Sequence, residues 1–452
     1  LSDYHASKIS LPQKEQEIEQ LTEKLQTLEG TADQTDKKVQ KQLKKLKAEL
    51  ETKQKALSSL QESLSQLEAN EDLKSKATAF PDIARLAREE TAKLHAGDAE
   101  NNDLWKQFLP QCLDLIQGVY DRLDIHFDMT LGESFYQPML ADVVADLKQK
   151  GLATESQGAI CVFMKGKEAP FIVQKQDGAF TYATTDLATI KYRAEELNAD
   201  RILYVVDSRQ SEHFELLFST VKDWGYTDLE LQHVSFGSVL GEDGRPIKTR
   251  AGDSVGLDSL LNEAIQRAYN IVSEIDDDKH DGPELSKEER KQIAEVVGLG
   301  GIKYADLKHN RESDYRFDWD KMLAKQGDTA TYMQYAYARV NGIFRKGGID
   351  RDELRTHQQS LNLIEPTEIA LAMKINRYSE ILESVAAEAR PNYLTNYLYE
   401  LADLFSTFYD VCTVLKAEDE AVRTSRLLLS DLTARVVQNG LSLLGIRTCE
   451  RM

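Results

Sequence analysis

The stretch from Arg201 to Phe236 constrains the fold more than any other part of the chain. It begins with a β-rich apolar run, Arg201–Asp207 (RILYVVD), and continues into Ser211–Trp224, where apolar residues recur with helical spacing. It ends in a second β-rich run at Leu231–Phe236. Two strands joined through a helix are typical of a parallel α/β sheet. We therefore predict a parallel α/β sheet here.

Further β-rich runs precede this unit, and helical patterns follow it. Gly158–Met164 and Pro170–Lys175 are separated by a turn and are predicted to be strands. From about Ser286 onward, apolar residues recur almost entirely with helical spacing. We expect an α/β domain over residues 77–285, a helical junction over residues 286–326 and an all-α domain over residues 327–452.

Residues 1–76 have a different pattern. Leucines and related residues recur there in steps of three, four and seven, with a polar break at Gly30–Asp36, as in a coiled coil. The arm before the break is acidic and the arm after it begins with lysines, which favours an antiparallel hairpin. Pro12 suits the first turn of the first helix. A solvated structural arm explains the segment better than nucleic-acid contact through its lysines.

Charge and cysteine content limit the class of protein. The 452 residues include 56 Lys+Arg and 76 Asp+Glu, and the net charge of −20 argues against non-specific nucleic-acid binding over the whole surface. The four cysteines lie far apart without metal-ligand spacing, so we expect free thiols in a reducing cytoplasm and no metal site. No apolar run reaches the ~20 residues that a membrane-spanning helix needs.

Polar side chains follow the first strand of the predicted parallel pair. Arg209, Gln210 and His213 lie just beyond Asp207, at the sheet edge where parallel α/β folds bind ligands. The amide groups at the start of the next helix favour an anion there. A capped helix start, with Ser211 as the cap, explains the same residues without a ligand, and both interpretations stay open.

Two further segments carry candidate chemistry. Tyr182 and Asp186 stand four residues apart, so a helix would place them on one face, where a carboxylate beside a phenol suits a guanidinium group. The loop Gly241–Val255 combines glycines with cations that include Lys248 and Arg250. Cations on a mobile loop can neutralise phosphate charge during transfer. A capped surface helix and a solvent-exposed hairpin are the simpler alternatives.

Longer stretches resemble one enzyme family, the arginyl-tRNA synthetases. The block from Gly132 to Leu261 resembles them in the pieces GESFYQPML, LKQKGLATESQGAICVF, TYATTDLATIKYR, ILYVVDSRQSEHF and LGEDGRPIKTRAGDSVGLDSLLNEAI. The pieces GIKYADLKHNRESDYRFDWDKML, YMQYAYARVNGI, NYLYELADLFSTFYDVCTVL and QNGLSLLGIRTCERM resemble the family's junction and anticodon-binding domain. The resemblance covers about Ala77–Met452 and leaves residues 1–76 as an insertion.

The resemblance implies a fold and a reaction. The family has a class I, Rossmann-type catalytic domain and an all-α anticodon-binding domain. It joins arginine to tRNA through an arginyl-adenylate made from ATP, with Mg²⁺ expected. The resemblance assigns recognition of the arginine side chain to Tyr182, Asp186 and Gln210. The residues that it assigns to the ATP site are His213, Phe236, Gly237, Lys248, Thr249 and Arg250. Two of these, Lys248 and Arg250, are expected to be catalytic.

One signature of class I enzymes is missing from this sequence. No His-Ile-Gly-His-type motif, which holds the ATP phosphates at a helix N-terminus, precedes Gly132, and His5–Ser7 is no substitute. We therefore expect the chain to hold the second half of the catalytic domain and to be inactive alone. It would be either truncated or completed by a companion chain.

Other functions fit parts of the sequence. A non-catalytic tRNA-binding module would need only the helical domain, and a coiled-coil scaffold would explain only residues 1–76. A cysteine- or methionine-specific relative fits less well, because the Tyr182/Asp186 pair and the IKTRAG loop favour arginine and no cysteine–histidine zinc set is present. The favoured hypothesis is an arginine–tRNA ligase whose partners are arginine, ATP and arginine tRNA.

Overall fold

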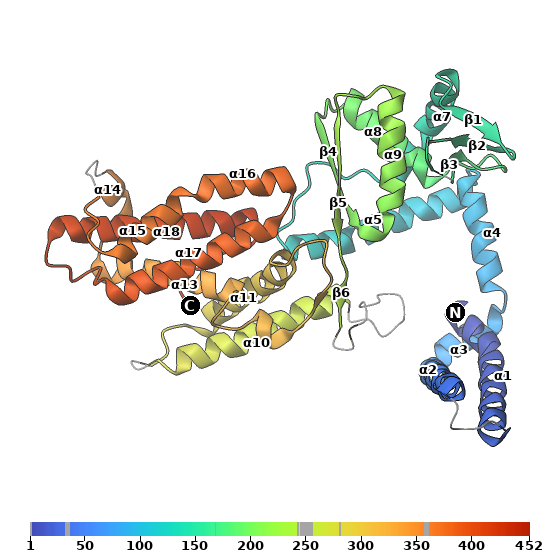
Figure 1. Cartoon of the computed structure of the whole chain (residues 1–452), viewed down its shortest axis with the longest axis horizontal. Helices are drawn as coiled ribbons and strands as arrows, with labels where there is room; N and C mark the ends of the chain where they lie inside the picture. Colours follow the sequence, from blue (N-terminus) through green and yellow to red (C-terminus); the bar gives the residue numbers. More distant parts are fainter. Residues whose placement is uncertain are drawn as a thin grey trace. The chain divides into compact units, whose positions relative to one another are not determined.

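The computed structural model describes residues 2–31, 37–167, 169–241, 244, 256–279, 282–356 and 361–452. The chain forms two units, Leu1–Gln117 and Gly118–Met452. The first unit is helical (Figure 1), and its helices are α1 (Ser2–Thr31), α2 (Lys37–Ala69), α3 (Glu71–Ala79), α4 (Ile83–His95) and most of α5 (Ala99–Arg122).

Helices α1 and α2 lie side by side and run in opposite directions. Lys8 near the start of α1 pairs with Glu68 at the end of α2 (3.1 Å), and Glu29 near the end of α1 pairs with Lys47 (2.8 Å). The early residues of one helix therefore meet the late residues of the other. All four side chains are solvent-exposed, so the pairs fix alignment more than they add stability.

Pro12 lies inside α1 rather than in its first turn, so that expectation is wrong. A proline inside a helix removes one backbone hydrogen bond, yet α1 begins upstream at Ser2. Tyr4 donates a hydrogen bond to Glu68 (3.3 Å), and the same carboxylate pairs with Lys8. These contacts with α2 stabilise the helical turns that precede the proline.

The second unit begins with an α/β part. Its elements are α6 (Glu133–Tyr136), the 3₁₀ turn η1 (Gln137–Met139), α7 (Leu140–Gln149), β1 (Ala153–Ser156), β2 (Ala159–Val162), β3 (Phe171–Gln174), α8 (Tyr182–Glu195), β4 (Arg201–Asp207), the 3₁₀ turn η2 (Ser208–Gln210), α9 (Ser211–Trp224), β5 (Glu230–Phe236) and β6 (Val239–Leu240).

Strands β1, β2 and β3 form a separate antiparallel sheet, and β1 was not predicted. The connection between β1 and β2 is the two-residue loop Gln157–Gly158, and both residues have positive φ (50° and 80°). A loop this short can join only antiparallel neighbours, and its backbone twist matches that of a hairpin.

Strands β4 and β5 are parallel, as predicted, and pair from Arg201↔Glu230 to Asp207↔Phe236. Ile202 and Tyr204 on one face of β4 are buried in the core that α8 and α9 cover. On the other face of the strand, Val205 is 67% exposed. The sheet therefore has one packed face and one face with an exposed apolar side chain.

The remainder of the second unit is almost entirely helical, as predicted. Its elements are α10 (Leu257–Asp277), α11 (Lys287–Leu307), β7 (Tyr315–Arg316), α12 (Trp319–Met322), α13 (Ala330–Gly347), α14 (Arg351–Thr356), α15 (Pro366–Asn376), α16 (Tyr378–Glu388), α17 (Pro391–Val411) and α18 (Glu420–Leu443). Helices α13, α15, α17 and α18 share one apolar core, and β7 pairs with β6 in parallel.

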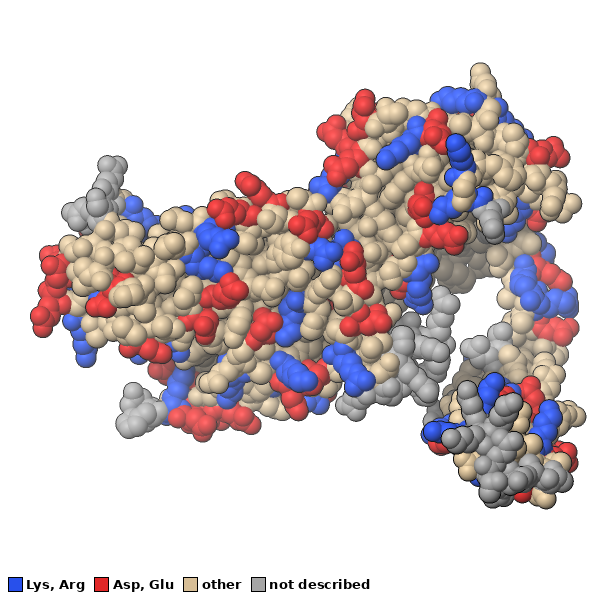
Figure 2. Space-filling view, in the orientation of Figure 1, with Lys and Arg blue, Asp and Glu red and all other residues tan. Residues whose placement is uncertain are grey.

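The surface mixes charges of both signs. Figure 2 shows acidic and basic side chains interspersed on the visible face.

All four cysteines are free. Among the described helices, none is long and apolar enough to cross a bilayer.

Candidate functional site

Three predicted site residues come together at the first turns of α8 and α9. Tyr182 begins α8, and Asp186 follows one turn later on the same face. His213 lies in the first turn of α9, with its Nε2 atom 2.7 Å from Asp186 Oδ2. The ring centroids of Tyr182 and His213 are 4.6 Å apart. The two helices therefore bring a carboxylate, an imidazole and a phenol into one cluster.

The three side chains of this cluster differ in how far they are exposed to solvent. The His213 side chain is only 8% exposed, and its ring also lies 5.7 Å from that of Phe171 on β3. Asp186 is 29% exposed at its side chain, and Tyr182 is 66% exposed. A carboxylate accepts about four hydrogen bonds, so the contact with His213 leaves acceptor capacity open. The cluster presents an oriented carboxylate beside an accessible phenol, which suits a cationic group with several N–H donors.

Gln210 is placed close to this cluster in the chain but is not joined to it. It ends η2 and precedes α9 as an exposed residue. Within the described ranges, no hydrogen bond links its side chain to Tyr182 or Asp186. Its assignment to arginine recognition stays a prediction.

The neighbouring Arg209 is engaged by Asp207. Its Nε and Nη2 atoms donate to the two carboxylate oxygens at 2.8 and 2.7 Å. Hydrogen bonds from the Arg209 side chain and backbone lower the pKa of Asp207 to about 2. Ser211 is not the helix cap that the simpler interpretation expected, because Gln210 occupies that position and Ser211 Oγ donates to the Ser208 carbonyl (2.6 Å).

Phe236 and Gly237 lie at the end of β5, and Phe236 is in register with Asp207 at the end of β4. The Gly237 amide donates to the Arg311 carbonyl at 2.7 Å. A Cβ atom at this position would lie 2.8 Å from the backbone of Ser313, so the close approach requires glycine. The strand end is thus fixed by the loop that follows α11.

The predicted loop residues Lys248, Thr249 and Arg250 lie outside the described residues, so their assignment stays a prediction. In the described part of the chain, no three His, Cys, Asp or Glu side chains form a group that could hold a metal ion.

An aromatic cluster on the helical part was missed by sequence reasoning. The Arg339 guanidinium on α13 lies 4.8 Å from the ring centroid of Tyr335 and 5.2 Å from that of Tyr409 on α17. Tyr335 and Tyr409 are both exposed. Stacked aromatic and guanidinium groups at a surface are the platform on which unpaired bases stack. The spacing of Tyr335 and Arg339, four residues apart on a helix, was the available signal.

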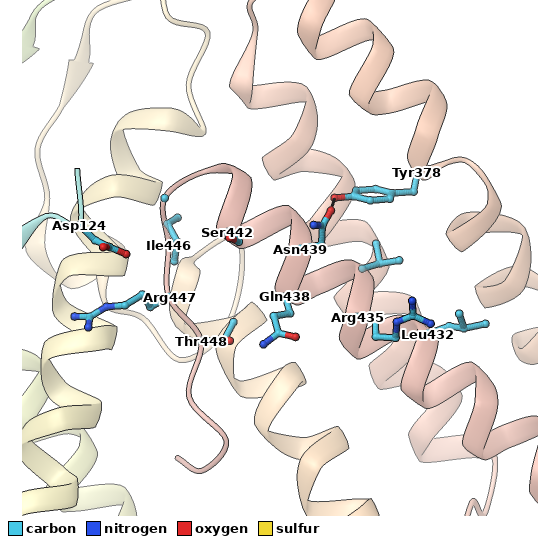
Figure 3. Close-up of a pocket in the computed structure, with 12 residues that line it drawn as sticks. Asp124, Tyr378, Leu432, Arg435, Gln438, Asn439, Ser442, Ile446, Arg447 and Thr448 are labelled. Atoms are coloured by element: carbon cyan, nitrogen blue, oxygen red, sulfur yellow. Dashed lines mark hydrogen bonds between the residues drawn. The ribbon is translucent and has the colours of Figure 1, made fainter. Parts of the chain in front are cut away.

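A pocket of about 820 Å³ lies in the same helical part (Figure 3). Arg435, Gln438 and Asn439 reach it from α18, and Tyr378 donates a hydrogen bond to Asn439 (2.6 Å) from α16. Arg447 lines it from the segment after α18. Guanidinium and amide groups donate hydrogen bonds to phosphate and ribose oxygens. None of its lining residues belongs to the Tyr182–Asp186–His213 cluster.

Two family models match this sequence. The model "tRNA synthetases class I (R), catalytic domain" matches residues 38–319, and the model "DALR anticodon binding domain" matches residues 333–452. A class I catalytic domain is thus followed by an all-helical DALR domain. The first match begins inside α2, earlier than the start near Ala77 that the sequence suggested.

Curated relatives of this chain are described as arginine–tRNA ligases. The arginine–tRNA ligase of Rhodopirellula baltica is 50% identical over 393 residues, which are 85% of this chain and 59% of that protein. The arginine–tRNA ligase of Edwardsiella ictaluri is 47% identical, over 82% of this chain and 64% of that protein. This chain therefore spans about three fifths of the length of these relatives. Since each aligns most of it within one polypeptide, they give no support to a separate companion chain.

A solved structure agrees with these matches. The arginyl-tRNA synthetase of Plasmodium falciparum superposes with a TM-score of 0.72 at 30% identity, over 84% of this chain and 64% of that one. The arginyl-tRNA synthetase of Thermus thermophilus has the same fold, with a TM-score of 0.70 at 24% identity.

Proposed function

Because this chain belongs to the arginyl-tRNA synthetase family, we propose that it serves the ATP-dependent attachment of arginine to its tRNA. In this reaction the arginine carboxylate attacks the α-phosphorus of ATP and displaces pyrophosphate. A terminal ribose hydroxyl of the tRNA then attacks the arginyl carbonyl and displaces AMP. ATP would enter with Mg²⁺, which neutralises part of its phosphate charge.

The observation that carries this proposal is the cluster of Tyr182, Asp186 and His213. Guanidinium is planar, always charged and rich in N–H donors. Asp186 can accept from it, and the accessible Tyr182 hydroxyl can accept a further N–H group. The contact from His213 holds the carboxylate in one orientation before the substrate arrives. We place His213 at the arginine subsite for this reason, and its assignment to ATP remains a prediction.

We assign the nucleotide to the neighbouring strand end. Phe236 and Gly237 end β5 beside the end of β4, at the sheet edge where parallel α/β folds bind ligands. The half-exposed Phe236 ring offers an apolar surface to a base. Lys248 and Arg250 would act on the phosphates from the loop between β6 and α10.

The helical domain is the proposed site of the tRNA. Tyr335, Arg339 and Tyr409 offer a stacking surface for unpaired bases, and the pocket that Arg435 lines offers donors for the RNA backbone. The stacking residues and all of the residues that line the pocket except Asp124 lie within the matched anticodon-binding domain.

Replacing Tyr335 with Ala in the full-length natural protein should weaken tRNA binding by roughly 5- to 150-fold, which corresponds to the ~1–3 kcal/mol of one base–aromatic stack. Tyr335→Phe keeps the ring and should bind nearly as well as the wild type. Filter binding at one fixed salt concentration measures both variants. Wild-type affinity of Tyr335→Ala would exclude this surface from the interface.

The exposed face of β4 suggests that this chain alone is not the complete enzyme. Val205 and Leu203 expose apolar side chains there, which favours further polypeptide against this face in the working enzyme. Together with the missing phosphate-binding signature, this supports the proposal that residues 1–452 by themselves do not complete the reaction. A tRNA-binding module remains the second candidate for the chain in isolation.

Helices α1 and α2 are proposed to act as a structural arm of coiled-coil type, which their antiparallel ion pairs support. Replacing residues 12–67 with a Gly/Ser linker in the full-length protein should leave arginine-dependent pyrophosphate exchange close to wild type. A large loss of exchange would show that the arm positions a substrate.

A charging assay tests the proposed function. The full-length natural protein is incubated with ATP, mixed tRNA and each of the twenty amino acids in turn. Only arginine should accumulate on tRNA, and residues 1–452 alone should produce none. Charging with another amino acid would refute the assignment, while charging by the chain alone would refute its incompleteness.

A further inference from the structure

Arg311, in the loop between α11 and β7, joins two distant parts of the second unit. Its Nη1 atom donates to the Ser235 carbonyl at 2.5 Å, and its Nε atom donates to the Ala389 carbonyl at 3.0 Å. Its own carbonyl accepts from the Gly237 amide at 2.7 Å. The side chain is 15% exposed. One residue therefore holds the end of β5 and the end of α16 together.

The attachment to β5 is tight and extends along the chain. A Cβ atom at Gly237 would lie 2.8 Å from the Ser313 backbone, which shows how closely the two segments approach. Ser238 donates its amide to Asp314 Oδ1 at 2.7 Å, and β6 then pairs with β7. A shift of the loop around Arg311 must therefore shift the strand end that carries Phe236.

The attachment to the helical domain is made at a strained turn. Ala389 caps the C-terminal end of α16 with φ of +51°, a conformation that non-glycine residues rarely adopt. Its carbonyl accepts a hydrogen bond from the Arg311 guanidinium. Arg390 comes next as the N-terminal cap of α17, which begins at Pro391 and also carries Tyr409. Movement of the α16–α17 connection therefore reaches Arg311 through one hydrogen bond.

We propose that Arg311 is a positioning residue that couples tRNA binding on the helical domain to ATP binding at the end of β5. The proposal rests on the proposed function, which places tRNA on the helical domain and ATP beside Phe236 and Gly237. A guanidinium donates in fixed directions and can hold two carbonyls at once, whereas the single ammonium of lysine is a point charge. Coupling of this kind is reciprocal, so each ligand tightens the other by the same factor.

The test measures that factor in the full-length protein. Calorimetry gives the affinity of α,β-methylene ATP with and without a transcript of arginine tRNA. In the wild type we expect tRNA to change this affinity by roughly fivefold or more, within the usual range of allosteric coupling. In Arg311→Lys each ligand should still bind, but the factor should fall close to one.

Arg390→Lys is the matched control. Arg390 lies beside the same turn and pairs with Glu312 (3.3 Å) and Glu388 (3.5 Å), but no described contact joins it to β5. Its coupling factor should equal that of the wild type. A wild type without coupling, or Arg311→Lys that weakens ATP binding equally with and without tRNA, would overturn the proposal. Failure of the proposed function gives a different result, in which neither ligand binds to the wild type.

A second variant serves if Arg311→Lys does not fold. Ala389→Gly suits the positive φ and should fold at least as well, while it loosens the carbonyl that Arg311 holds. The coupling factor should fall part of the way toward one. An unchanged factor in this folded variant would contradict transmission through Ala389.

Discussion

Replacing Asp186 with Asn in the full-length protein is expected to lower kcat/KM for arginine activation by roughly 30- to 1000-fold. This is the ~2–4 kcal/mol that accompanies loss of one partner from a buried charge pair. Asn keeps the shape of the side chain but removes the negative charge that we propose pairs with the substrate guanidinium. Arginine-dependent pyrophosphate exchange measures the effect.

Two comparisons separate recognition from general damage. Asp223→Asn changes an exposed carboxylate on α9 outside the cluster and should leave kcat/KM within twofold of wild type. His213→Gln removes the imidazole that orients Asp186 and should cause a smaller loss than Asp186→Asn, because the charge remains. Activity of Asp186→Asn within a few-fold of wild type would make Asp186 a structural residue.

Replacing Glu368 with Ala is expected to destabilise the protein by about 3–5 kcal/mol, the cost of removing one member of a buried ion pair. Glu368 on α15 is fully buried and accepts from Arg426 Nε on α18 at 2.6 Å. It also accepts from the Ile364 and Glu365 amides. The substitution leaves the Arg426 charge buried without its partner. Urea unfolding followed through the helical domain measures the loss.

The same pair predicts a pH dependence. Burial opposes ionisation of Glu368, but hydrogen bonds from the Glu365 amide, Arg426 and the Ile364 amide outweigh it and lower its pKa below the ordinary 4.5. Because the folded pKa is the lower one, its stabilisation is complete above pH 4.5 and is lost as the pH falls below that value. The difference between wild type and Glu368→Ala should therefore shrink in acid. Glu383→Ala, which removes an exposed carboxylate on α16, should change stability little at any pH.

Local patterns in the sequence predicted the elements that carry the candidate site. The runs Arg201–Asp207 and Ser211–Trp224 are β4 and α9 with the same bounds, because apolar content and helical spacing are local properties. The shared helix face of Tyr182 and Asp186 followed from their spacing in the same way. These features needed no knowledge of the tertiary fold.

Contacts between distant segments could not be predicted in this way. His213 and Asp186 are 27 residues apart and meet only because α8 and α9 pack on the same face of β4. Arg311 appeared to be one of many basic residues, and its partners Ser235 and Ala389 lie 76 and 78 positions away. The expectation for Pro12 was wrong for the same reason, because contacts with α2 stabilise the turns of α1 that precede the proline.

The proposed arginine site requires that Asp186 receive the arginine side chain. A crystal structure of the full-length protein with bound arginine tests it directly. We expect a guanidinium nitrogen about 2.7–2.9 Å from an Asp186 carboxylate oxygen, the usual length of a charge-assisted hydrogen bond. The Tyr182 hydroxyl should be in contact with the same group. A guanidinium bound elsewhere, with Asp186 contacting only His213, would contradict the account.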